Sequence, residues 1–73
     1  MDEWLRRQRE AALAHPLRAE MMELLTDGGL GLRELHHRLP GEHSLSVVNH
    51  HLARLQAVDL VSWEDGRYQV VSG

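Results

Sequence analysis

GLRELHHRLPGEHSLSVVNHHLARLQAVDLV, residues 31–61, is the stretch of sequence that decides the fold. It predicts two helices separated by a short break at Pro40-Gly41. In the second helix, predicted over residues 44–57, Leu45, Val48, Leu52 and Leu55 recur at the spacing of one buried helical stripe. The side chains on the opposite face and its flanks are small or hydrogen-bonding: Ser46, Val47, Asn49, His50, Ala53, Arg54 and Ala57. One side of this helix is therefore expected to anchor it in a core, and the other to contact a partner.

This division between an anchoring face and a contact face is typical of a helix–turn–helix, which lays its second helix in a groove of DNA. Both helices carry start signals. Gly31 is predicted to cap the first, with Glu34 as half of a capping box, and Ser44 to cap the second. The helix–turn–helix is therefore predicted over residues 31–57.

Further elements are predicted on both sides of this stretch. Residues 2–14 predict an N-terminal helix that ends before Pro16. Residues 17–26 predict a second helix, which Asp27-Gly28-Gly29 terminates, and Leu30 is expected to add a residue or two of strand. Beyond residue 57, two β-prone runs at 60–63 and 68–71 flank Glu-Asp-Gly-Arg (64–67), and Asp-Gly in that position is typical of a hairpin.

The prediction is a single domain over residues 1–73, mainly α with a small β-hairpin. Its N-terminal helix (1–14), helix–turn–helix (31–57) and wing (60–71) give three to four helices followed by a two-stranded wing, the order of a winged helix–turn–helix.

Composition narrows the function. The 73 residues include no cysteine, which excludes disulfides and thiolate metal sites and suits a reducing cytoplasm, where we expect the protein to act. No apolar run approaches the ~20 residues of a membrane span, and MDEWLRRQRE lacks the apolar region of a signal peptide. The net charge of −3 opposes binding to DNA. However, the acids crowd into residues 1–27 and leave residues 31–57 near neutral, which predicts weak intrinsic affinity.

Several segments resemble the winged helix–turn–helix of ArsR-type bacterial repressors: HPLRAEMMELL (15–25), GLRELHHRL (31–39), SLSVVNHHLARLQAVDLV (44–61) and the hairpin. The most specific part is the pattern of Ser44 or Ser46, Val48, His51-Leu52, Leu55 and Leu60-Val61. The resemblance implies a bacterial transcription regulator that binds double-stranded DNA with the first half of the 44–57 helix in the major groove. The residues it places there are Ser44, Leu45, Ser46, Val47, Asn49 and His50, with Arg67 of the wing tip (64–67) near phosphate or the minor groove.

Side-chain chemistry agrees with much of this assignment. Asparagine can pair with adenine through two hydrogen bonds, serine can bond to several bases, and valine can contact a thymine methyl group. Arg33 and Arg54 suit phosphates, whereas Leu45, at the edge of the buried stripe, is kept as a structural residue.

The sequence departs from the family's pattern in three respects. Asp59 stands where the family usually has glycine, the cysteine-containing metal sites are missing, and the chain stops after the wing, where the family commonly adds a dimerising helix. These departures leave the N-terminal helix, with Trp4 and Leu5, as the expected surface for a homodimer. The alternative function is a winged-helix protein-interaction or dimerisation module without DNA binding, which the negative charge and short chain favour.

The remaining candidates are weaker. Six histidines invite a metal site, but adjacent histidines diverge by about 100° on a helix, so a site would have to combine different helices or chains. We expect no metal, no cofactor and no enzymatic activity, because no nucleophile or phosphate-binding loop is recognisable. His51 is expected to pack and His50 to face outward. Trp63 is expected beneath the wing, and Trp4 fits either the core or an interface.

Overall fold

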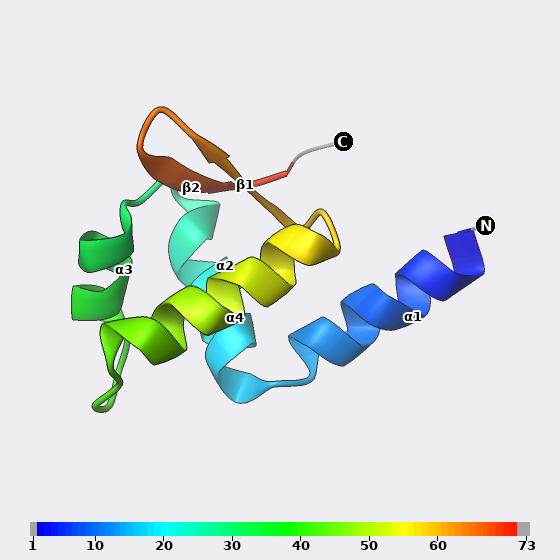
Figure 1. Cartoon of the computed structure of the whole chain (residues 1–73), viewed down its shortest axis with the longest axis horizontal. Coiled ribbons are helices and arrows are strands. Elements are labelled where there is room, and N and C mark those ends of the chain that lie inside the picture. Colours follow the sequence, from blue (N-terminus) through cyan, green and yellow to red (C-terminus); the bar gives the residue numbers. More distant parts are fainter. Residues whose placement is uncertain (1, 72–73) are drawn as a thin grey trace.

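Four helices precede a β-hairpin in the computed structural model, which describes residues 2–71 (Figure 1). The elements are α1 (Asp2–Leu13), α2 (Pro16–Thr26), α3 (Leu32–Arg38), α4 (Leu45–Ala57), β1 (Val61–Glu64) and β2 (Arg67–Val70). The predicted fold class, mainly α with a small hairpin in the order of a winged helix–turn–helix, is confirmed. Within the described residues, no helix combines the length and apolar character needed to cross a membrane.

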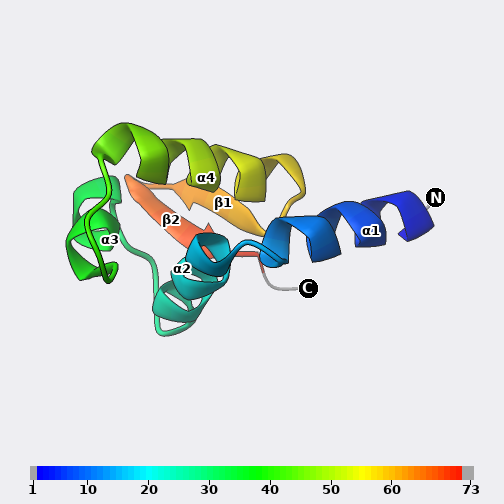
Figure 2. The same ribbon diagram turned by 90° about the horizontal axis from the view of Figure 1, so that it is seen from below.

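The elements from α2 onward form one body, and α1 projects from it. α4 packs against α2, α3 and β1, while α1 contacts α2 and α4. The views in Figures 1 and 2 both show the first half of α1 extending beyond the other elements. Its second half is held by buried Ala12 and by Arg9, whose Nε donates a hydrogen bond to the Val58 carbonyl at 2.8 Å.

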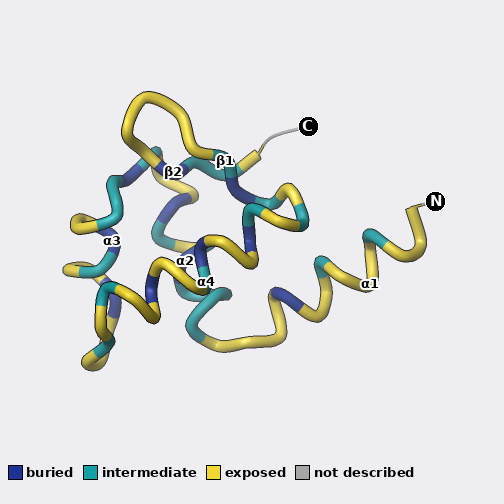
Figure 3. The backbone as a smooth tube through the Cα atoms, viewed as in Figure 1, coloured by how far each residue is buried: buried dark blue, intermediate teal, exposed yellow. Residues whose placement is uncertain are grey.

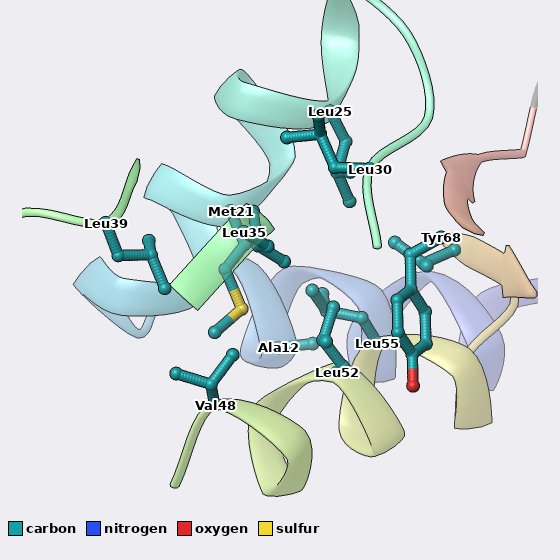
Figure 4. Packing of buried hydrophobic residues seen from close by; sticks show 11 residues of the cluster. Ala12, Met21, Leu25, Leu30, Leu35, Leu39, Val48, Leu52, Leu55 and Tyr68 are labelled. Atoms are coloured by element: carbon teal, nitrogen blue, oxygen red, sulfur yellow. The ribbon is translucent and has the colours of Figure 1, made fainter. Parts of the chain in front are cut away.

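The core lies between the helices and the hairpin (Figure 4). Val48, Leu52 and Leu55 of α4 are each 0% exposed, which confirms the stripe predicted from their spacing. Leu45 is half-buried at the edge of that stripe. The other buried residues come from every remaining element and from the connections next to α3: Ala12, Met21, Leu25, Leu30, Leu35, Leu39, Val61 and Tyr68.

The wing is a two-residue hairpin. Val61 pairs with Val70 and Glu64 with Arg67, so only Asp65-Gly66 forms the turn, not the four residues expected from the sequence. Both turn residues have positive φ, 50° and 76°, as a hairpin turn matching the strand twist requires. Leu30 adds the predicted strand residue, exchanging backbone hydrogen bonds with Tyr68 of 2.7 and 3.1 Å.

The expectation that Trp63 packs beneath the wing is wrong. Trp63 is 50% exposed, and its ring lies against the ring of Tyr68 with 4.7 Å between centroids. The reason is its position: Leu30 pairs with β2, so β1 is the outer strand, and Trp63 sits one residue pair from the turn. Tyr68, on the inner strand, takes the buried place instead.

α4 ends in a Schellman motif. The Leu60 N–H donates to the Leu55 carbonyl and the Asp59 N–H to the Gln56 carbonyl, both at 3.0 Å. This motif requires a left-handed conformation at the residue that follows the C-cap Val58. That residue is Asp59, which has φ 57°. Aspartate therefore adopts the conformation that glycine would adopt more easily.

We predict that Asp59→Gly leaves the free energy of unfolding unchanged or raises it slightly, whereas Asp59→Val lowers it by about 1–2 kcal/mol. A β-branched side chain clashes in the left-handed region, and glycine does not. Urea denaturation followed by circular dichroism measures both variants. Equal stability of the valine variant and the parent would contradict the assigned cap.

Candidate nucleic-acid interface

The face of α4 that points away from the core is exposed to solvent. Ser46, Val47, Asn49 and His50 are all exposed, in alternation with the buried stripe (Figure 3). Within residues 2–71, no hydrogen bond occupies the side chains of Ser46, Asn49 or His50. Ser44 differs, because its Oγ accepts the Val47 N–H at 3.1 Å and so caps the helix, as predicted. The groups available to a partner are therefore those of the first two turns after the cap.

The charges near this face are unequally distributed. α4 contains no aspartate or glutamate, and Arg54 is exposed on its second half. Arg33 is exposed on α3. Arg67 stands directly opposite Glu64 and two residues after the exposed Asp65, so the wing tip has two carboxylates and one guanidinium. Of the predicted phosphate contacts, Arg67 thus has the least favourable surroundings.

The structure gathers six of the eight predicted DNA-binding residues on α4 or at its cap: Ser44, Ser46, Val47, Asn49, His50 and Arg54. Arg33 and Arg67 come from α3 and the wing. The arginines in the first turns of α1 add little positive charge to this surface, because Arg6 and Arg7 form ion pairs with Glu3 at 2.6 and 3.3 Å.

Two histidines hold the connection between α3 and α4. His36 Nε2 donates to the His43 carbonyl, and His43 Nε2 donates to the Pro40 carbonyl at 3.1 Å. A carbonyl can only accept, so each of these ring nitrogens carries its proton. Sequence reasoning missed this role, because the His36 ring and the His43 carbonyl are seven residues apart and meet only when the chain turns at Gly41, where φ is 84°.

Three histidines cluster where α4 passes the start of α2. The His51 ring lies 4.4 Å from that of His15 and 5.3 Å from that of His50, measured between centroids. His15 caps α2, its Nδ1 accepting the Leu17 N–H at 3.2 Å. His51 is half-buried, as expected, and its Nδ1 is buried without a hydrogen-bond partner among the described residues.

These surroundings affect the titration of His51. Burial lowers its pKa below 6.5, and the positive charges of His15, Arg18, His50 and His43 lower it further. Within residues 2–71, no three His, Asp or Glu side chains are arranged so that they could hold a metal ion, and this includes the cluster of His15, His50 and His51.

The predicted self-association residues lie on α1, outside the core. Trp4 is 68% exposed, so it does not belong to the core, and its place in an interface stays a prediction. Leu5 is half-buried on the side of α1 that also carries Arg9 and Ala12.

No family model matches the sequence, and no curated protein is significantly similar to it. The likeness to ArsR-type regulators therefore rests on the motifs and on the order of elements.

We predict that the protein loses thermal stability between pH 7.5 and pH 5.5, partly through His51. Its folded-state pKa is below that of the unfolded chain, so the unfolded state binds more protons as the pH falls below 6.5. His51 thus stabilises the fold above that pH and loses this contribution as the pH falls through its lowered pKa.

Melting temperatures of the parent and of His51→Gln, measured at both pH values, check this prediction. The glutamine variant should show a smaller decrease, and His37→Gln, at an exposed position of α3, should behave like the parent. An identical decrease in parent and His51→Gln would show that His51 is not responsible.

Proposed function

We propose that the protein is a DNA-binding transcription regulator that inserts α4 in the major groove of duplex DNA. The observation that carries this proposal is the division of α4 into two faces. Val48, Leu52 and Leu55 fix the helix in the core, and the opposite face exposes hydrogen-bonding groups without any carboxylate. A neutral-to-positive, unoccupied helix face is what entry between two phosphate backbones requires.

Each exposed side chain has a task in this proposal. Asn49 pairs with adenine through two hydrogen bonds, Ser46 bonds to a base edge, and Val47 contacts a thymine methyl group. His50, exposed beside them, reaches a base or a phosphate. Arg54 and Arg33 contact phosphates and set the position of the helix, with Arg67 of the wing tip (64–67) making a lesser contact to phosphate or the minor groove.

The resemblance to ArsR-type repressors supports the same function. In this proposal the protein acts in a bacterial cytoplasm, without a metal, a cofactor or a catalytic activity. Its net charge of −3 makes the affinity modest and strongly dependent on salt.

We predict that Asn49→Ala weakens binding to a preferred duplex by about 1–3 kcal/mol and leaves binding to unrelated duplexes unchanged, because only base contacts discriminate. Arg54→Ala should weaken all duplexes alike. Fluorescence anisotropy at low salt, with a duplex selected from a random-sequence pool, measures both.

Arg7→Ala is the control for Arg54→Ala. It removes the same charge from α1, away from α4, and should keep the affinity of the parent. Absence of any binding by the parent at micromolar concentration would overturn the proposal.

A second function is favoured by the exposure of Trp4. A winged-helix interaction module, without DNA binding, would use α1 to bind a second copy of the chain. The projecting half of α1 and its 68% exposed tryptophan suit such a contact, since buried tryptophans dominate many protein interfaces.

If this second function is correct, sedimentation equilibrium should show a dimer that Trp4→Ala weakens by about tenfold or more. Leu5→Ala should act in the same direction. Trp63→Ala is the control, because Trp63 is the other exposed tryptophan, at 50%, and lies on the wing. A monomeric parent, or an equal effect of both tryptophan variants, would exclude association through α1.

A further inference from the structure

A groove of about 200 Å³ lies between α1 and α4. Trp4, Gln8 and Ala11, spaced i, i+4 and i+7, line it from one face of α1. Arg54 and Ala57 line it from α4, and Arg18 reaches it from α2. Three helices that are separate in sequence therefore contribute to one concave surface.

The charge of this groove is uncompensated. Arg18 and Arg54 both face it, and no acidic residue belongs to its described lining. The Nε of Arg18 is buried and has no hydrogen-bond partner within residues 2–71. By contrast, Arg6 and Arg7 on the same helix as Trp4 are paired with Glu3. A buried donor without an acceptor is unfavourable. The guanidinium groups of Arg18 and Arg54 also have no carboxylate beside them in the described lining, and an oxyanion bound there would compensate their charge.

Apart from the two arginines and Gln8, the described lining of the groove is apolar. Trp4 is 68% exposed, and the small side chains of Ala11 and Ala57 leave its ring accessible. An indole ring in this setting offers a flat surface against which an aromatic group can stack. The volume of about 200 Å³ is below the ~300–1,000 Å³ of sites for drug-sized molecules, which limits the occupant to a small one.

We propose that this groove binds a small organic anion, a carboxylate or phosphate monoester attached to a flat apolar group. The oxyanion lies between Arg18 and Arg54, and the apolar group lies against Trp4. The guanidinium fork suits both oxyanions, because each can accept two parallel hydrogen bonds. The site does not depend on DNA binding, and Arg18, which has no part in the proposed DNA surface, is the residue that tests it.

The test is a titration of the ¹⁵N-labelled full chain with phenyl phosphate and with benzoate, without DNA, followed by NMR. We expect saturable shifts of the Trp4 indole N–H, the Arg18 Nε–H and the Ala57 amide with one or both probes. Inorganic phosphate, which has the oxyanion alone, should bind about tenfold more weakly because it lacks the contact with Trp4. His51 provides a second readout, since an anion beside Arg18 offsets one of the charges that lower its pKa and should raise that pKa.

Arg18→Met should weaken binding by about tenfold or more, since it removes the charged hydrogen-bond donor. Arg38→Met, which removes the same charge from an exposed position of α3, should bind like the parent. Ala11→Glu gives an independent variant should the first fail to fold, because it places a carboxylate at an exposed, helix-compatible position of the groove and should also abolish binding. Absence of saturable shifts, or equal binding by the parent and the folded variants, would overturn the proposal.

Discussion

Burial of the α4 stripe is the constraint on which the other features depend. Val48, Leu52 and Leu55 are fully buried, and α4 contacts all three other helices and β1. Because successive residues are about 100° apart around a helix, these three positions fix the direction of every other side chain on α4. A rotation by one residue would expose a leucine and bury Asn49 or an adjacent polar group, at a cost that the small core could not offset. Burial of the stripe therefore both stabilises the fold and leaves Ser46, Val47, Asn49 and His50 exposed.

The distribution of charge explains how a protein with a net charge of −3 can still offer a surface for anions. Glu3 forms ion pairs with Arg6 and Arg7 on α1, and the two acids of the wing tip, Glu64 and Asp65, lie near Arg67 in the hairpin. α4 has no carboxylate, and Arg54 has no ion-pair partner within residues 2–71. The proposed DNA surface and the proposed anion groove share Arg54. Both therefore depend on guanidinium charge that no nearby carboxylate on α4 neutralises.

The sequence predicted most of the fold, because its local signals act at short range. The stripe of α4, the Ser44 cap and the Asp-Gly turn are each decided by residues within a few positions of one another. Trp63 was misplaced because its exposure depends on which hairpin strand pairs with Leu30, a long-range contact that spacing does not reveal. The groove of Trp4, Arg18 and Arg54 was missed for the same reason, since it depends on the angle at which α1 leaves the body. Of the candidate site, the α4 face could be predicted and its surroundings could not.

The most direct measurement of the central claim is an amide and side-chain NMR map of the labelled protein with and without a selected DNA duplex. If the exposed face of α4 enters the major groove, the largest shifts should fall on Ser46, Val47, Asn49 and His50, while Glu23 on α2 stays unchanged. Shifts confined to Trp4 and the rest of α1, or no shifts at all at millimolar duplex and low salt, would contradict it.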